Sequence, residues 1–449
     1  MSIRKTSFRG KLRVASALCG IVLTAGTLSA CSGGSAASGA TEELNILLHD
    51  SPGTTKALKN MTKEFEKKNP SVKVNLDFLS TNDYPAARTA RLAAGAVDIV
   101  EGNTTVAGVP DPSYVKRVKV SDWVKGVEAG NWVDLSDQPF MKNFDPAVVD
   151  TVKFKGKSYQ VVTSLNYYTG VMYNKDIFEK QGLDVPTTWS EFVAVMDKLK
   201  AAGITPVSIG GKDGWPVGLI PMSIMQGTYP TPEQKTQLDK ALWGGETKLS
   251  DPKLAEVMEK TKTIFDHADP NFTGIDYATA EGQFIGGQAA MTFDGSWATQ
   301  QFSQQNPGLK FGYFPMPGTE RAEDNKNLGG KLDFSLAIPT ASKNQDAAMK
   351  WLAFFSDKEN YAKFANDSGI IPSQPNTPVS QQLRDVLGPA LDEQFQPGWG
   401  DVFHSNPGAG PNVGAIGLNF ANLAPMGKLA TGKDAQEAAE QDWTAALPK

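Results

Sequence analysis

The stretch from position 44 to 78, LNILLHDSPGTTKALKNMTKEFEKKNPSVKVNLDF, decides the fold class of this chain. It opens with a run of mostly apolar residues, which ends at a Ser-Pro-Gly turn at 51–53. Apolar residues at helical spacing follow: Leu58, Met61 and Phe65. From 72 to 78 apolar and polar residues alternate, which is the pattern of a half-buried strand. Strand, helix and strand in this order predict a βαβ unit with a parallel sheet.

The same combination of elements recurs after position 160. Thr188 and Glu191 have the spacing of a capping box at a helix start. The helix that follows has one apolar face: Phe192, Val195, Met196 and Leu199. Strands are expected at 204–209 and 332–338, and a further helix face at 348–355. A second α/β lobe is therefore predicted, and 449 residues are enough for two or more lobes of about 150 residues each.

The first thirty residues have the pattern of a secretory signal. An uncharged apolar run at 14–27 follows a cluster of basic residues: Arg4, Lys5, Arg9, Lys11 and Arg13. A basic start, an apolar centre of this length and small residues behind it are typical of a signal peptide rather than a membrane span. We therefore expect residues 1–30 to be removed on export.

Cys31 directly follows Leu-Ser-Ala, and this sequence resembles a bacterial lipobox, in which the cysteine thiol is lipidated and becomes the new N-terminus. Residues 32–41 are only Ser, Gly, Ala and Thr, and such a segment cannot bury enough apolar area to fold. Residues 31–43 are thus expected to be a lipidated cysteine and a flexible tether. The alternative is a signal peptide cut elsewhere, beside an unrelated cysteine.

Charge and cysteine content exclude several classes of function. The predicted signal removes five of the 44 basic residues and none of the 49 acidic ones, which leaves a formal net charge of −10. So acidic a surface repels nucleic acid, and no nucleic-acid partner is expected. Cys19 lies in the signal, so Cys31 is the one cysteine of the exported chain and an intrachain disulfide is excluded.

Motifs for catalysis or for a cofactor are missing from the sequence. The three histidines, at positions 49, 267 and 404, form no HxxxH pair, and no metal or other cofactor is predicted. The sequence has no Gly-x-Ser-x-Gly elbow. We therefore expect no enzymatic activity, although 49 acidic residues leave the carboxylate pair of a glycoside hydrolase open.

Three tryptophans stand beside turn glycines and polar residues. They are Trp215 in GGKDGW, Trp297 in FDGSW and Trp399 in PGWGD. A flat apolar ring flanked by hydrogen-bonding groups suits a sugar, whose C–H faces stack while its hydroxyl groups need donors and acceptors. The alternative for each tryptophan is packing in a core.

Several strings, in the same order along the chain, resemble the family 1 extracellular solute-binding proteins of ABC importers, which include the maltose-binding proteins. The resemblance extends from about position 44 to the C-terminus. The matching strings are YNKDIF at 173–178 with PTTW at 186–189, then AEGQF at 280–284 with AAM at 289–291 and GSW at 295–297, and finally KN at 343–344 with WL at 351–352 and GIIP at 369–372.

This resemblance implies the architecture. The fold class is α/β, a two-lobed periplasmic-binding-protein-like fold with a ligand cleft between the lobes and several hinge crossings. Lobe one is expected at 44–162 plus 335–380, and lobe two at 163–334 plus 381–449. The chain is expected to be a monomer.

The resemblance also implies where the ligand contacts lie, in loops after the first strands of lobe one and among aromatic residues of lobe two. Asp50 is followed by Ser51, where maltose-binding relatives have a basic residue. Trp189 is expected to be structural. The implied ligand-binding residues are His49, Asp50, Ser51, Glu101, Asn103, Thr104, Asn166, Tyr167, Trp215, Asp294, Trp297 and Trp399.

The implied function is capture of a sugar, a neutral di- or oligosaccharide, by hinge closure and its delivery to the transmembrane permease subunits of an ABC importer. Cys31 would anchor the exported protein in the outer face of the cytoplasmic membrane. Two other classes stay open: a binding protein for a non-sugar solute such as a polyol, glycerol phosphate or a polyamine, and a lipid-anchored glycoside hydrolase. Arginine is sparse near the implied loops, which disfavours a phosphate ligand.

Overall fold

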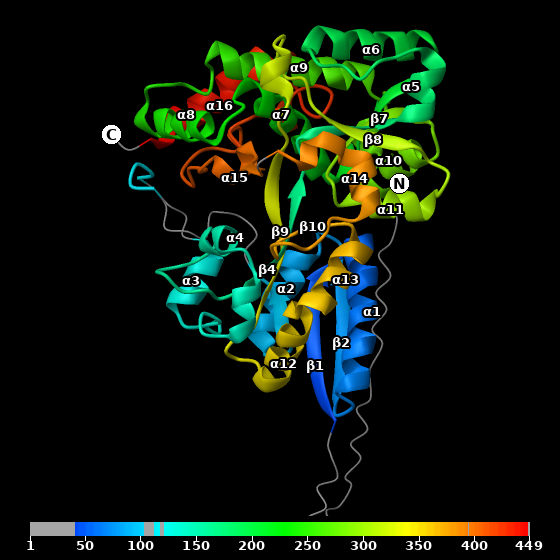
Figure 1. The fold of residues 1–449 in the computed structure, drawn as a ribbon. Coiled ribbons are helices and arrows are strands. Elements are labelled where there is room, and N and C mark those ends of the chain that lie inside the picture. Colours follow the sequence, from blue (N-terminus) through cyan, green and yellow to red (C-terminus); the bar gives the residue numbers. More distant parts are fainter. Residues whose placement is uncertain (1–40, 103–111, 117–120, 394, 448–449) are drawn as a thin grey trace, which may run out of the picture. The chain divides into compact units, whose positions relative to one another are not determined.

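The computed structural model describes residues 41–102, 112–116, 121–393 and 395–447 (Figure 1). The predicted signal, Cys31 and most of the predicted tether lie outside the described residues. So do Asn103 and Thr104, two of the implied ligand-binding residues.

The larger of two sheets contains the stretch that decides the fold. Its strands follow the order β10-β4-β9-β3-β1-β2, with β11 paired to β9. β1 pairs in parallel with both β2 and β3, which confirms the predicted βαβ unit, while β9 runs antiparallel to β3 and β4. The strands are β1 Glu42–His49, β2 Val72–Leu79, β3 Ile99–Glu101, β4 Val161–Tyr167, β9 Gly329–Ala337, β10 Ile371–Pro372 and β11 Gln396–Pro397.

Helices pack on this sheet through apolar faces. Pro52 stands in the first turn of α1, where its missing N–H costs nothing, and the apolar positions predicted for this helix are buried. The returning helices α12 and α13 lie beside α1 although they are far from it in sequence (Figure 1). The helices of this part are α1 Pro52–Lys68, α2 Tyr84–Ala94, α3 Asp122–Glu128, α4 Pro146–Asp150, α12 Gln345–Ser356 and α13 Lys358–Ser368.

The smaller sheet has the strand order β6-β7-β5-β8, in which β6 and β7 are parallel and β5 is antiparallel to both β7 and β8. Its strands are β5 Gly170–Asn174, β6 Thr205–Ser208, β7 Ala289–Asp294 and β8 Phe311–Pro315. The capping box predicted at Thr188 and Glu191 is present at the start of α6, whose four predicted apolar residues are buried.

The remaining helices belong to the part of the chain that contains the smaller sheet. They are α5 Lys175–Gln181, α6 Trp189–Ala201, α7 Trp215–Thr228, α8 Pro232–Gly244, α9 Pro252–His267, α10 Tyr277–Ile285, α11 Ala298–Gln305, α14 Gln381–Leu387, α15 Trp399–Val402 and α16 Gly432–Ala446. Short 3₁₀ helices are η2 Pro139–Asn143, η3 Gly211–Asp213, η4 Phe272–Gly274, η5 Ala322–Asn325, η6 Gly388–Leu391 and η7 Phe420–Asn422.

We use lobe one for the larger sheet with its helices, and lobe two for the smaller sheet with its helices. The chain passes between them at the β4–β5 and β8–β9 connections and after β10, and it returns briefly to the larger sheet at β11. The boundaries expected at 162/163 and 334/335 fall within β4 and β9, two strands that pair with each other in the larger sheet. Where a hinge would divide the chain stays a prediction.

No helix within the described ranges has both the length and the apolar character that crossing a membrane requires.

Candidate functional site

A cavity of about 490 Å³ lies between the two lobes. This volume is within the range of small-molecule sites. Its lining combines the C-terminal ends of β1 and β3 and the first half of β9 with the starts of α7, α10 and α15. The lining residues are His49, Asp50, Ser51, Pro52, Thr81, Tyr84, Pro85, Glu101, Tyr168, Trp215, Leu219, Met222, Tyr277, Trp297, Gln301, Lys331, Asp333, Gly400, Asp401 and Ile416.

His49 and Glu101 meet on the lobe-one side of this cavity. They end β1 and β3, which are parallel neighbours, so their side chains reach the same edge of the sheet. His49 Nδ1 lies 2.6 Å from Glu101 Oε1, and the His49 ring stacks on Phe334 at 4.4 Å between centroids. Burial alone would lower the pKa of His49, but the hydrogen bond and the charge of Glu101 raise it above its ordinary value.

Asp50 and Ser51 extend the same rim toward α1. Asp50 Oδ1 accepts a hydrogen bond of 2.7 Å from the Thr55 hydroxyl, and Thr55 N–H donates to the carbonyl oxygen of Ser51. The helix start thus fixes both residues at the mouth of the cavity. Of the implied contacts from lobe-one loops, the structure brings together His49, Asp50, Ser51 and Glu101.

Lys331 and Asp333 of β9 form the polar floor, which the sequence reasoning missed. Lys331 Nζ lies 3.1 Å from Asp333 Oδ1, and Asn166 donates to Asp333 Oδ2 at 2.6 Å. Burial lowers the pKa of Lys331, but the charge and hydrogen bond of Asp333 outweigh it and raise that pKa. Asn166 and Tyr167 are themselves buried and do not line the cavity, so Asn166 orients Asp333 instead of facing the ligand space.

Three aromatic residues form the lobe-two side, which we call the aromatic wall: Trp215, Tyr277 and Trp297. The ring centroids of Trp215 lie 4.7 Å from Tyr277 and 6.4 Å from Trp297. Trp297 Nε1–H donates to the Tyr277 hydroxyl at 3.1 Å, and Lys331 Nζ lies 5.1 Å from the Trp297 ring centroid. Tyr277, at the first turn of α10, had no neighbouring motif that singled it out.

Asp294 lies behind the aromatic wall. Its carboxylate accepts a hydrogen bond of 3.0 Å from the Tyr277 hydroxyl, and the side chain does not line the cavity. Burial raises the pKa of Asp294 well above its ordinary value, and the charge of Glu281 raises it further. The carboxylate of Asp294 therefore reaches the cavity lining only through Tyr277, and the implied contact of Asp294 with a ligand stays a prediction.

Trp399 also lies away from the cavity lining, because its indole packs in the core of lobe two. It is 1% exposed, its Nε1–H donates to the carbonyl oxygen of Ile416 at 2.8 Å, and its ring lies 5.3 Å from that of Phe403. The next two residues, Gly400 and Asp401, line the cavity instead.

Asp401 adds a carboxylate on the lobe-two side. Its Oδ2 accepts a hydrogen bond of 2.8 Å from the Tyr168 hydroxyl. Burial raises the pKa of Asp401 to about 6, so the group is ionised at neutral pH. With Asp50, Glu101 and Asp333, four carboxylates face a cavity that contains one lysine.

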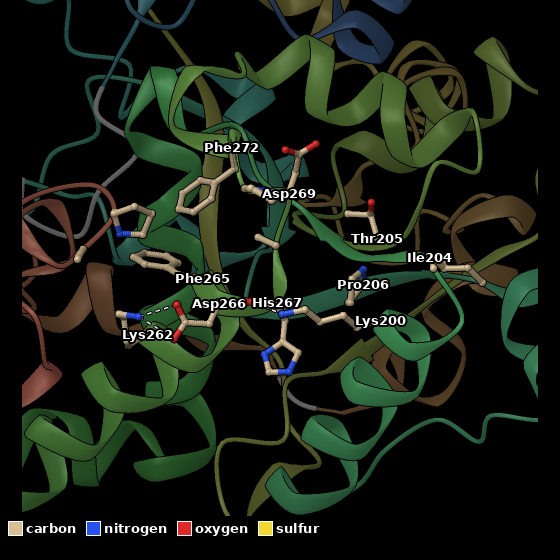
Figure 2. Close-up of a pocket in the computed structure, with 15 residues that line it drawn as sticks. Lys200, Ile204, Thr205, Pro206, Lys262, Phe265, Asp266, His267, Asp269 and Phe272 are labelled. Carbon is tan, nitrogen blue, oxygen red and sulfur yellow. Dashed lines mark hydrogen bonds and ion pairs between the residues drawn. The ribbon is translucent and has the colours of Figure 1, made fainter.

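A second pocket lies at the start of β6 and the end of α9 (Figure 2). It shares no lining residue with the cavity between the lobes. Its polar groups are paired among themselves: Lys262 Nζ lies 2.5 Å from Asp266 Oδ1, and Lys200 donates to the Asp266 carbonyl oxygen at 2.9 Å. His267 Nε2 lies 2.9 Å from Asp197. The cavity between the lobes is the better candidate site, because its lining combines carboxylates and a lysine with the three rings of the aromatic wall. Among the described residues, no cluster of three His, Cys, Asp or Glu could hold a metal ion.

Residues 51–362 match the family model of the bacterial extracellular solute-binding proteins. The chain belongs to this family. The resemblance seen in the sequence is thereby confirmed, and the extracellular class of the family agrees with export. The family consists of solute-binding proteins.

Individual relatives agree with this assignment. The multiple sugar-binding protein of Streptococcus mutans is 27% identical over 358 residues, 78% of this chain and 80% of the relative. An ABC transporter extracellular-binding protein of Pyrococcus horikoshii is 25% identical over 73% of this chain and 70% of the relative. The structure of RafE in complex with raffinose has a TM-score of 0.71 at 23% identity, covering 91% of this chain and all of that one. The predicted two-lobed α/β fold class is confirmed.

Proposed function

We propose that this solute-binding protein captures a neutral sugar between its lobes and delivers it to the permease of an ABC importer. The observation that carries the proposal is the pairing of the aromatic wall with the carboxylates and lysine across the cavity. A pyranose ring offers C–H faces that stack on indole and phenol rings, and hydroxyl groups at its edge that donate to carboxylates and accept from lysine. The named sugar-binding relative and the raffinose-bound fold relative support this ligand class.

The charge of the cavity favours a neutral ligand over an acidic one. Four carboxylates face Lys331 and His49, and two of them, Asp333 and Glu101, already pair with these groups. A phosphate or uronic acid would bring further negative charge close to Asp401, at a cost that low local dielectric increases. A polyamine would match the charge but has no flat face to stack on the aromatic wall.

Hinge closure is the proposed transport step. Contacts already bridge the lobes at their rims: Asn82 donates to Asp213 at 3.3 Å, and Lys56 Nζ donates to Gln304 at 3.2 Å. A ligand that touches both lobes binds the closed form more tightly, and this difference in affinity is what shifts the population. Small-angle scattering should show a smaller radius of gyration at saturating sugar. An unchanged radius would refute closure and leave binding intact.

Lipidation of Cys31 is the proposed means of retention. Two or more acyl chains on this residue would hold the exported protein on the outer face of the cytoplasmic membrane, within reach of the permease. The predicted lobe boundaries and the monomeric state belong to the same proposal.

The test is a thermal-shift screen of the purified protein against neutral di- and oligosaccharides, with phosphorylated and uronic sugars, glycerol phosphate and polyamines as comparison sets. Ligand at 100 times its dissociation constant stabilises by about 2.7 kcal/mol. At about 2 to 4 °C per kcal/mol for lobes of this size, the shift is easily measured. Binding restricted to the acidic or polyamine sets would refute the sugar proposal. Hydrolysis of a labelled oligosaccharide would favour the glycoside hydrolase.

A further inference from the structure

We propose that Asp294 and Glu281 share a proton behind the aromatic wall and act as positioning residues for Tyr277 and Trp297, so that ligand affinity falls when the pair loses that proton. This inference rests on the proposed function, because it concerns the same cavity. It names a regulation of the site by pH.

The geometry places both carboxyl groups directly behind the wall. Tyr277 and Glu281 are four residues apart on α10, so their side chains share one face of the helix. Asp294 ends β7 and accepts from the Tyr277 hydroxyl, which in turn accepts from Trp297 Nε1–H. One acid thus fixes a phenol that fixes an indole, and both of these rings line the cavity.

Glu281 is only partly satisfied where it is buried. Its Oε2 accepts a hydrogen bond of 3.0 Å from Gln301, another residue of the cavity lining. Its Oε1 is buried and has no hydrogen-bond partner in the described part of the chain. Burying an ionised carboxylate oxygen that accepts no hydrogen bond costs free energy, and protonation of the carboxyl group lowers that cost.

The groups packed around the pair do not neutralise it. Glu281 acts on Asp294 with a like charge. The Tyr313 hydroxyl of β8 donates to the Asp294 carbonyl oxygen, and Asp213 of η3 accepts from the Tyr277 N–H. Lys331 of β9, which lines the cavity, lies against the Trp297 ring and pairs with Asp333.

Because the charge of Glu281 acts on Asp294 and both groups are buried, the two do not both ionise readily, and the pair titrates as a unit. Burial raises the pKa of Glu281 to about 7 and that of Asp294 well above its ordinary value. At mildly acidic pH the pair therefore holds a proton that a solvent-exposed pair would have lost.

A bound sugar would cover Tyr277, Trp297 and Gln301 and exclude water from the wall. The second negative charge then becomes more costly in the complex than in the free protein, so the complex retains the shared proton more strongly. By linkage, affinity falls as pH rises above about 7, by at most tenfold per pH unit for one proton. We expect about tenfold weaker binding at pH 8.5 than at pH 6.

The decisive variant is Glu281→Gln, which has the same shape and cannot ionise. The dissociation constant of the best sugar from the screen is measured from pH 5.5 to 9 for wild type, Glu281→Gln and the exposed control Glu246→Gln. His49, whose pKa is raised, and Asp401, whose pKa is about 6, remain in all three proteins. Wild type and the control should lose affinity above neutral pH, and Glu281→Gln should lose much less. Parallel profiles in all three proteins would overturn the proposal.

A second measurement needs no sugar and separates this inference from the proposed function. Because the folded-state pKa of Glu281 is raised above its unfolded value, its contribution to stability is present at low pH and is lost as pH rises through about 7. The melting temperature of Glu281→Gln should therefore rise relative to wild type between pH 5 and pH 8.5. A constant difference would overturn the shared proton, whatever the protein binds. Asp294→Asn provides an independent variant with the same expectations.

Discussion

Replacing Trp297 with alanine removes the ring that connects the two sides of the cavity. This indole donates to Tyr277, packs beside Trp215 and lies under the ammonium group of Lys331. It is half-buried, with one part packed in the lobe and another lining the ligand space. Alanine deletes the stacking surface and leaves the Tyr277 hydroxyl without this donor.

The expected loss of binding affinity and the expected loss of folding stability differ in size. Stacking contributes about 1 kcal/mol beyond the area term. About 40 Å² of ring face covered by the sugar adds about 1 kcal/mol at 25 cal/mol per Å². Together they predict about thirtyfold weaker binding. The lost hydrogen bond and the lost packing of the buried part of the ring together cost about 1 to 2 kcal/mol of stability, or about 2 to 8 °C in the melting temperature.

Trp399→Ala is the matched control, because the same substitution is made in the core. Truncating a buried tryptophan costs about 3 to 5 kcal/mol of folding free energy, which corresponds to about 6 to 20 °C. Titration calorimetry on the folded protein and melting curves without ligand are measured for both variants. Trp297→Ala should lose affinity with a small change in melting temperature, and Trp399→Ala should do the reverse. If Trp297→Ala loses stability and keeps its affinity, the ring does not contact the ligand and the sugar proposal loses its main support.

Three further predictions concern buried charge and the anchor. Lys235 is fully buried and donates to Gln226 at 2.6 Å and to the Pro397 carbonyl oxygen at 2.8 Å, and burial lowers its pKa to about 8. Its folded-state pKa is thus below the unfolded value near 10.4. The free energy of unfolding of wild type, measured in urea titrations, should therefore rise between pH 8 and 10 relative to that of Lys235→Met. An equal dependence of the two free energies on pH would contradict this. Because the pKa of His49 is raised, its pair with Glu101 stabilises the fold fully below about pH 6.5 and loses this effect as pH rises. Glu101→Gln should therefore lose more folding stability at pH 5.5 than at pH 8.5. A larger loss of stability at pH 8.5 would count against the pairing. Cys31→Ser should release protein to the medium or leave an unprocessed precursor, and membrane-bound protein of processed mass would refute lipidation.

The sequence was sufficient for the parts of the fold that depend on local pattern. The spacing of apolar residues locates β1, α1 and β2. His49 and Glu101 end two parallel neighbouring strands, which places them together without knowledge of the remaining fold. A capping box predicts the start of α6 because both of its residues are local. The larger arrangement came from the resemblance, since no local pattern says which sheet a distant strand joins.

The residues that the sequence did not indicate, and those that lie behind the cavity lining, share one physical cause. The sequence shows which face of an element is polar or apolar, but it does not show which element packs against that face. Alternation in β9 marks Lys331 and Asp333 as polar positions, but only the opposite lobe turns that face from a solvent side into a cavity floor. Trp399 and Trp297 have similar turn residues beside them in the sequence. Trp399 nevertheless donates to the Ile416 carbonyl oxygen inside lobe two, whereas Trp297 lines the cavity. Tyr277 has no motif of its own.

The two sides of the cavity are supplied by separate frameworks, the aromatic wall by lobe two and the His49 and Glu101 pair by the strand ends of lobe one. Substitutions at or directly after the strand ends, at His49, Asp50, Ser51 and Glu101, would therefore change which hydroxyl groups are recognised without repacking the aromatic wall. Selection acting on a duplicated gene could shift the sugar preference through lobe one while conserving lobe two. For the design of sugar biosensors, lobe one is the part to randomise and lobe two the part to leave intact.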